Sequence, residues 1–376
     1  MRFLVTGGAG FIGSHFVRQL LAGTYPDLPV DRLTVLDKLT YAGNLANLEA
    51  VSDDPRLSFV QGDIGDAELL DELLPGTDAV VHFAAESHVD RSIEGSAVFV
   101  RTNVLGTQTL LQSALDARVG RVVHVSTDEV YGSIATGSWT EDHPLEPNSP
   151  YAASKASSDL LARAYHRTHG LDVRVTRCCN NYGPYQFPEK VVPLFVTNLL
   201  DGLPVPLYGD GLNVREWVHT DDHCRGIALV LARGRAGETY NIGGGLELTN
   251  RELTGMILDA CGADWSMVRQ VEDRKGHDLR YSLDGGKIER ELGYRPRVPF
   301  TQGLARTVRW YQEHRAWWEP LKKPGDETGR GGGPGADSGA SLTGNDPAAP
   351  ETPSVPGFPE APSVPASADA PAGDHP

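Results

Sequence analysis

The residues best suited to acid–base chemistry fall into two short groups. Thr127, Asp128 and Glu129 place a hydroxyl and two carboxylates in consecutive positions, and Tyr151 and Lys155 form the chain's only Tyr-x-x-x-Lys. On a helix, residues four apart share a face, so the last two side chains would be neighbours. An ammonium beside a phenol favours the phenolate, which can act as a base near neutral pH. Together the two groups could supply a hydroxyl, an acid and two bases.

Each group also has a purely structural interpretation. Asp128 and Glu129 could cap and begin a helix, and Tyr-x-x-x-Lys is a weak pattern by itself. The chemical interpretation gains weight only if a nucleotide site lies nearby. The elements that would position these residues therefore have to be found first.

The first group follows a predicted buried strand. Residues 122–125, Val-Val-His-Val, are apolar and β-branched, and a helix is predicted from Tyr151 to Gly170. In an open α/β sheet, ligands bind at the carboxyl ends of the strands. Thr127, Asp128 and Glu129 would then lie at the mouth of a binding site.

The start of the chain carries a glycine-rich motif. Residues 2–6 predict a strand, Gly7, Gly10 and Gly13 follow it, and a helix is predicted to begin at Ser14. Glycines at such a turn allow a tight bend, close approach of the backbone to a pyrophosphate and close helix–strand packing, while the helix N-terminus faces the anion. Gly-x-x-Gly-x-x-Gly is one residue wider than the usual fingerprint. Its position between a strand and a helix still predicts dinucleotide binding.

The second predicted strand, residues 33–36, ends at Asp37. An acidic residue about twenty positions past the glycine loop can accept hydrogen bonds from the adenosine ribose, and it would repel a 2′-phosphate. This favours NAD over NADP. The alternative is an ordinary surface aspartate at a strand end.

Strands and helices alternate through the first half of the chain. Further strands are predicted at 57–60, 79–83 and 172–176, and a helix at 97–117. This pattern predicts an α/β fold, an NAD-binding Rossmann domain with a doubly wound parallel sheet, and a smaller C-terminal substrate-binding lobe. We expect residues 1–178 to form mainly the Rossmann domain and residues 179–323 mainly the substrate-binding lobe, with some segments of the latter returning to the Rossmann domain. The acidic, proline- and glycine-rich tail, 324–376, is expected to be disordered.

Composition excludes some functions. The 376 residues include 50 acidic and 34 basic side chains, a net charge of −16, which argues against nucleic-acid or anionic-membrane binding. The four cysteines show no disulfide or zinc spacing, and no apolar run is long enough to span a bilayer. The first strand begins at residue 2 and leaves no room for a signal peptide. We therefore expect a soluble cytoplasmic protein.

Taken together, the motifs resemble the extended short-chain dehydrogenase/reductase superfamily, and within it the dTDP-glucose 4,6-dehydratases, most of all those of deoxysugar synthesis for secondary metabolites. The resemblance covers roughly residues 1–320. Two features depart from the family pattern: Lys275 stands where proline is more usual, and the tail from residue 324 is not a family feature. The motifs that carry the resemblance are TGGAGFIGSHF (6–16), FAAESHVDRSI (83–93), VSTDEVYG (125–132), SPYAASKASSD (149–159), NNYGPYQFPEK (180–190), REWVHTDDH (215–223), YNIGG (240–244) and DRKGHDLRY (273–281).

The resemblance implies a reaction and a role for each catalytic residue. Tyr151, as a phenolate, would remove the carbon-4 hydroxyl proton while hydride passes to NAD, with Lys155 lowering the phenol pKa and holding the ribose. Thr127 would hydrogen-bond the carbon-4 oxygen. Glu129 would abstract the carbon-5 proton and Asp128 would protonate the departing carbon-6 hydroxyl. Hydride would then return to carbon 6, so that NAD is regenerated in each cycle.

The resemblance also implies two sets of binding residues and a homodimer joined through helices 97–117 and 151–169. Arg215 would clamp the diphosphate, because a guanidinium fork matches phosphate oxygens; the alternative is a surface ion pair. Around NAD the implied residues are Gly7, Gly10, Phe11, Ile12, Gly13, Asp37, Lys38, Leu39, Thr40, Asp63, Ile64, Phe83, Ala84, Ala85, Ser87, Thr102, Tyr151, Lys155 and Asn180. Around the sugar nucleotide, dTDP-glucose, they are Ser87, Thr127, Asn180, Glu189, Lys190, Val191, Pro206, Leu207, Tyr208, Arg215, Asn250, Asp273, Arg274, Lys275, Gly276 and His277.

Other functions stay open at this point. His219 and His223 have metal-ligand spacing, but the chemistry needs no metal, and Asp221 is better explained as the cap of a helix over 223–231, so we expect none. A sugar-nucleotide 4-epimerase would share the glycine loop, tyrosine and lysine but would not need the Asp128–Glu129 pair. A non-catalytic NAD sensor on the same fold commonly lacks the catalytic tyrosine, which is present here.

Overall fold

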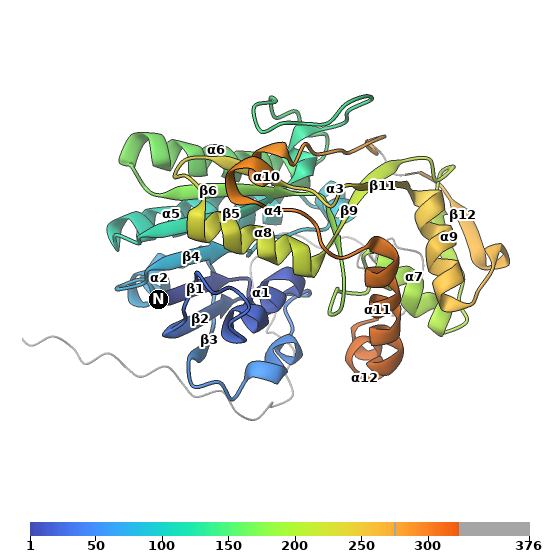
Figure 1. Cartoon of the computed structure of the whole chain (residues 1–376), viewed down its shortest axis with the longest axis horizontal. Helices are drawn as coiled ribbons and strands as arrows, with labels where there is room; N and C mark the ends of the chain where they lie inside the picture. Colours follow the sequence, from blue (N-terminus) through green and yellow to red (C-terminus); the bar gives the residue numbers. More distant parts are fainter. Residues whose placement is uncertain (274–275, 323–376) are drawn as a thin grey trace, which may run out of the picture.

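The computed structural model describes residues 1–273 and 276–322 (Figure 1). The predicted tail, 324–376, and two of the predicted substrate residues, Arg274 and Lys275, lie outside the described part of the chain.

A seven-stranded parallel sheet forms the centre of the larger part of the molecule, in the order β10-β6-β5-β4-β1-β2-β3. The strand order reverses direction between β1 and β4, which is the switch point where doubly wound sheets bind ligands. The predicted fold class is therefore confirmed. The strands are β1 Arg2–Thr6, β2 Arg32–Asp37, β3 Leu57–Gln61, β4 Ala79–His82, β5 Arg121–Thr127, β6 Val173–Cys178 and β10 Thr239–Ile242.

Helices cover both faces of this sheet (Figure 1). On one face lie α1 Phe11–Leu21, α8 Thr220–Arg233 and α10 Gly286–Leu292, and on the other α2 Ala67–Leu73, α5 Thr107–Asp116 and α6 Pro150–His169. The strands are buried on both sides, and valines such as Val81 and Val123 have no exposed surface. Continuous apolar strands of this kind are what a sheet covered on both faces requires.

Two helices differ from the sequence expectation. Helix α1 begins at Phe11, three residues before the predicted Ser14. The helix predicted over 97–117 consists of α4 Ala97–Phe99, a π-helical turn Val100–Gly106 and α5. From the π-helical turn, the Asn103 amide donates to Ser154 Oγ on α6 and pairs with the backbone of Glu86. Such turns interrupt helices most often at functional sites, and side-chain periodicity does not reveal them.

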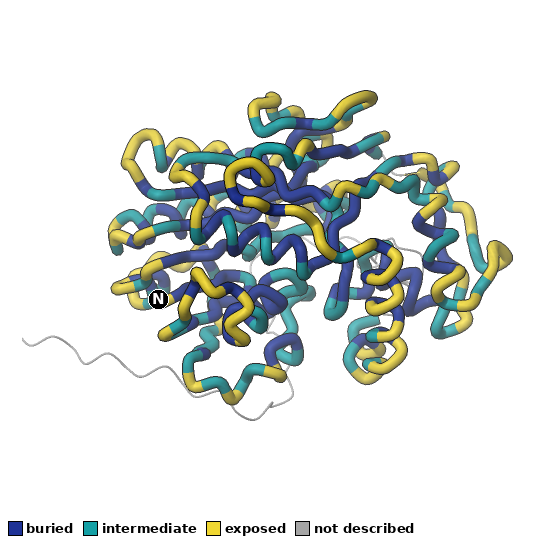
Figure 2. The backbone as a smooth tube through the Cα atoms, viewed as in Figure 1, coloured by how far each residue is buried: buried dark blue, intermediate teal, exposed yellow. Residues whose placement is uncertain are grey.

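The smaller lobe packs around its own core, which includes Tyr182, Trp217, Tyr311 and Trp318. It contains helices α7 Val191–Leu200, α9 Asn250–Cys261, α11 Phe300–Glu313 and α12 Arg315–Trp318. Its strands are β7 Asn180–Tyr182, β9 Val214–His219 and β11 Leu246–Thr249 in one sheet, and β8 Val205–Tyr208 and β12 Val268–Val271 in another. Strand β10 and helices α8 and α10 return from the second half of the chain to the large sheet, and Figure 2 shows buried stretches of backbone in both parts.

The remaining short elements connect these layers. They are helix α3 Val89–Glu94 and single 3-10 turns at Leu45–Val51, Asp128–Tyr131, Trp265–Met267 and Glu319–Leu321. None of the helices in residues 1–273 and 276–322 is long and apolar enough to cross a membrane.

Candidate active site

Two adjoining cavities open at the carboxyl ends of the large sheet's strands, where the smaller lobe covers them. The first measures about 420 Å³ and the second about 190 Å³. They share part of their lining, so the two cavities adjoin. This shared wall consists of Ser87, Glu129, Asn180, Glu189, Lys190, Val191 and Trp217.

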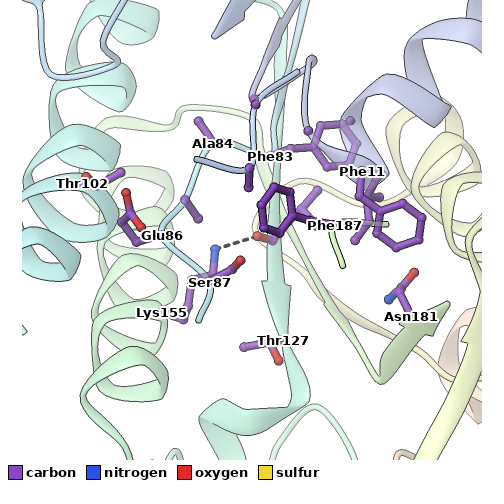
Figure 3. A pocket seen from close by; sticks show the side chains of 18 of the residues that line it. Phe11, Phe83, Ala84, Glu86, Ser87, Thr102, Thr127, Lys155, Asn181 and Phe187 are labelled. Atoms are coloured by element: carbon purple, nitrogen blue, oxygen red, sulfur yellow. Dashed lines mark hydrogen bonds between the residues drawn. The ribbon is translucent and has the colours of Figure 1, made fainter. Parts of the chain in front are cut away.

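The first cavity is lined by every residue predicted to contact NAD except Leu39. Leu39 adopts a positive φ of 55° and its side chain packs against the core beneath α1, so it does not line the cavity. In Figure 3, Phe11, Phe83 and Phe187 stand on one side of the pocket and Glu86 and Thr102 on the other.

The glycine loop closely fits the predicted dinucleotide. Gly7 has a φ of +69°, and a Cβ there would lie 2.5 Å from the backbone nitrogen of Ala84. A Cβ on Gly13 would overlap the carbonyl of Gly7. Only glycine is accommodated at these two positions, which lets the N-terminus of α1 face the cavity as an anion-binding end.

Asp37 ends β2 at the edge of the same cavity. Its two carboxylate oxygens accept from the backbone nitrogens of Ala9 (2.9 Å) and Leu39 (2.8 Å), and burial raises its pKa despite these bonds. Each carboxylate oxygen has a second lone pair that can accept from a ribose hydroxyl. The backbone nitrogens of the loop and the carboxylate of Asp37 thus fit the pyrophosphate and the ribose of NAD.

The second cavity collects most of the predicted sugar-nucleotide residues. Beyond the shared wall, it is lined by Pro206, Leu207, Tyr208, Arg215, Asn250, Gly276 and His277, all of which were predicted. Asp273 does not line it; its carboxylate pairs with His277 Nδ1 at 2.7 Å. Thr127 lines the first cavity instead of the second.

Arg215 is buried rather than placed in a surface ion pair. Its guanidinium donates to the carbonyl oxygens of Val214 (2.7 Å) and Asp278 (2.9 Å) and lies 4.2 Å above the centre of the Tyr281 ring. Tyr281 in turn donates its hydroxyl to Asp278 at 2.6 Å. A guanidinium held in place by carbonyls and a ring is pre-positioned for an anionic ligand.

The acid–base residues at the end of β5 line the first cavity, and Glu129 lines the second as well. Thr127 Oγ1 accepts from the Glu129 backbone nitrogen at 3.3 Å and donates to Asp128 at 3.2 Å, so Thr127 caps the 3-10 turn that follows. Asp128 is only 2% exposed, and burial raises its pKa well above the usual value, with the charges of Glu129 and Glu216 adding to the effect. Burial therefore favours the protonated form of the Asp128 carboxyl.

The phenolate at Tyr151 stays a prediction, and the surroundings of the phenol act against it in the protein alone. Burial raises the pKa of Tyr151 well above 10, and Glu129 raises it further. The Lys155 ammonium donates to the Val125 carbonyl at 2.8 Å (Figure 3), and burial lowers the pKa of Lys155 to about 8. Lys155 shares the helix face as expected, but desolvation of the phenol and nearby negative charge outweigh it.

The histidines of α8 have structural roles. The helix begins at Thr220, and His219 is its cap, accepting from the Asp221 nitrogen at 3.2 Å, so the predicted capping by Asp221 is wrong. His223 Nδ1 bonds Asn181 at 2.8 Å. The described residues include no group of three or more His, Cys, Asp or Glu side chains that could hold a metal ion.

Several lining residues escaped prediction. In the first cavity these include Glu86, Cys178, Asn181 and Phe187, and in the second Tyr281. Glu86, Asn181, Phe187 and Tyr281 lie inside motifs that carry the resemblance, but no rule of spacing marks them. Which neighbours of a motif face inward depends on how the two parts of the chain fold against each other.

The Rossmann sheet, the glycine loop with its acidic partner and the adjoining polar cavity define an NAD-dependent enzyme with a second site for its substrate. Comparison with known proteins agrees. Residues 4–307 match the family model described as GDP-mannose 4,6 dehydratase, and the chain belongs to this family, among its dTDP-glucose 4,6-dehydratase members.

Individual relatives resemble the chain along almost their whole length. A dTDP-glucose 4,6-dehydratase from Streptomyces antibioticus is 68% identical, covering 86% of this chain and 96% of its own. The crystal structure of a dTDP-glucose 4,6-dehydratase from Streptomyces venezuelae, with NAD and dTDP bound, is 80% identical at a TM-score of 0.85, covering 86% of this chain and 100% of its own. A UDP-glucose 4-epimerase from Thermotoga maritima is 32% identical at a TM-score of 0.76, covering 83% and 99%.

Proposed function

We propose that the protein converts dTDP-D-glucose into dTDP-4-keto-6-deoxy-D-glucose and water, the reaction of a dTDP-glucose 4,6-dehydratase. Residues 1–178 would mainly bind NAD and 179–323 mainly the sugar nucleotide. The observation that carries the proposal is that Glu129 lines both cavities while its neighbour Asp128 lines the first. Elimination of water needs an acid and a base on the same sugar, and this pair offers both.

The raised pKa of Asp128 supports the division of labour within the pair. A carboxyl group that stays protonated near neutral pH can donate its proton to the carbon-6 hydroxyl, which leaves as water. Glu129 lines both cavities and would take the proton from carbon 5. That proton becomes acidic only when carbon 4 is a ketone, because the carbanion is then delocalised onto the carbonyl oxygen.

Tyr151 and Thr127 would serve the oxidation at carbon 4. Thr127 can hydrogen-bond the carbon-4 oxygen and Tyr151 can accept its proton. When bound, NAD supplies a hydride acceptor for this step and a positively charged ring in the first cavity. The charged ring and the Lys155 ammonium favour the phenolate, which burial and Glu129 disfavour in the protein alone.

The experiment that tests this proposal is product analysis by NMR after incubation with dTDP-glucose. A dehydratase forms the 4-keto-6-deoxy sugar without net accumulation of NADH. A 4-epimerase, the second candidate, would form dTDP-galactose instead, and an NAD sensor would leave the substrate unchanged. Sustained accumulation of NADH in proportion to product would indicate an ordinary dehydrogenase.

The proposal includes a homodimer in the cytoplasm, where free cysteines such as those in this chain are the rule. Exposed apolar side chains gather on α4, the π-helical turn and α6: Val98, Val100, Leu105 and Leu160 are 44–57% exposed. A second copy packed against this face would bury them, as in a two-fold helix bundle. Sedimentation equilibrium of the full chain at micromolar concentration tests this, and a monomer there would exclude the dimer.

A further inference from the structure

Three segments that line the cofactor cavity are held together by contacts of Tyr41 and Arg91, two residues to which the roles above assign nothing. The segments are the loop after β2, represented by Thr40, Ala42 and Gly43, the start of α3 after Ser87, and the loop before α7, represented by Phe187 and Glu189. The first two belong to the Rossmann part and the third comes from the second half of the chain.

Arg91 on α3 contacts both the loop after β2 and the loop before α7. Its guanidinium lies 3.8 Å from the centre of the Tyr41 ring, and its Nη2 is 3.2 Å from Glu189 Oε2. The Glu189 side chain is only 9% exposed, whereas that of Arg91 is 34% exposed. An ion pair with one buried member, combined with stacking on a ring, is stronger than an exposed pair.

Two further contacts connect the same segments. The edge of the Tyr41 ring packs against Phe187, with ring centres 5.7 Å apart at 86°, and Lys190 Nζ donates to the Ser87 carbonyl at 2.7 Å. Figure 3 shows Phe187 among the side chains that line the pocket. Tyr41, Arg91, Phe187 and Glu189 thus form a clasp that links the nucleotide loop of the Rossmann part to the wall shared by both cavities.

The proposed function gives this clasp a role in retaining NAD, because hydride leaves the substrate and returns to it within one turnover. The dinucleotide must then stay bound between the two transfers, and losing it in the reduced form would end the cycle. We propose that Arg91 is a positioning residue whose contacts with Tyr41 and Glu189 keep NAD from exchanging with solvent. The clasp does not touch the reacting carbon atoms and so should affect retention more than chemistry.

The test measures NAD exchange without any turnover. The full-length protein with its bound NAD is mixed with excess radiolabelled NAD, and the label that stays with the protein after rapid gel filtration is followed over time. We expect Arg91→Ala to exchange about ten times faster than the unaltered protein, a modest loss for a stacked ion pair. At saturating NAD, its kcat should stay within about twofold.

Arg315→Ala is the matched control. Arg315 also stacks on a ring, 4.8 Å from the centre of Trp318, and pairs with Asp201, but it lies on α12 and lines neither cavity. It should exchange NAD at the unaltered rate. Tyr41→Leu removes the stacking partner while keeping apolar bulk, and it should exchange faster as well.

The outcomes separate cleanly. If folded Arg91→Ala or folded Tyr41→Leu exchanges NAD at the unaltered rate, the clasp does not retain the cofactor. If Arg315→Ala accelerates exchange equally, the effect is general loosening and the inference fails. Because exchange is measured without substrate, a failure of the proposed dehydratase reaction would show in product analysis and leave this result independent.

Discussion

Replacing Lys155 by methionine should make the folded protein more stable at neutral pH while abolishing its activity. Lys155 is 4% exposed, and its ammonium is held in the interior by the Val125 carbonyl. Methionine has a similar length and no charge, so the change removes the cost of burying the ammonium and leaves the packing nearly intact.

The magnitude follows from the pKa. Burial lowers the pKa of Lys155 from 10.5 to about 8, and at ~1.4 kcal/mol per pKa unit this corresponds to about 3 kcal/mol at pH 7. Loss of the hydrogen bond to Val125 reduces this stabilisation by about 1 kcal/mol. The variant should therefore gain about 2 kcal/mol in the free energy of unfolding at pH 7.

The stability difference between the two proteins should also change with pH in a definite direction. A lysine whose pKa is lower in the folded state destabilises the fold while it is charged, and this cost disappears as pH rises from the folded to the unfolded pKa. Unaltered protein should therefore gain stability relative to the variant above about pH 8 and match it near about pH 9.5.

Urea unfolding followed by tryptophan fluorescence, with NAD removed from both proteins, measures the difference directly. Lys38→Met is the control: the Lys38 side chain is 58% exposed, so stability should change by less than about 0.5 kcal/mol at either pH. A Lys155→Met protein that is less stable than the unaltered one at pH 7 would refute the reasoning.

Three further predictions follow from the site and the core. Glu129→Gln should retain transient NADH formation but lose solvent deuterium exchange at carbon 5, because an amide cannot take the proton; survival of both near normal levels would exclude Glu129 as the base. Asp159→Asn should destabilise the protein by about 3 kcal/mol in urea unfolding, since it leaves Arg177 buried beside a neutral group; an unchanged midpoint would contradict this. Truncation after Lys323 should leave kcat/KM unchanged, because the described lining residues of both cavities end at Tyr281; a raised KM would show that the tail acts at the site.

Elements with a local cause could be predicted from the amino-acid sequence. Alternating apolar strands and helices specify a doubly wound sheet, and the glycine loop specifies the nucleotide end because positive φ and close backbone approach exclude side chains at Gly7 and Gly13. The order of strands then follows from short right-handed crossovers, which place all carboxyl ends along one edge. For the same reason, Thr127, Asp128 and Glu129 could be placed at the mouth of a site before their surroundings were known.

The protonation tendencies of those residues, and the side chains that face them, depend on the assembled fold. Tyr151 and Lys155 were expected to form a phenolate and an ammonium from their spacing alone, but burial acts against both charges, and the extent of burial depends on elements far away in the chain. The π-helical turn at Asn103, the inward Tyr281 and the contact of Arg91 with Tyr41 and Glu189 likewise arise between distant segments. Desolvation and packing are properties of the assembled molecule, and no local pattern of residue types encodes them.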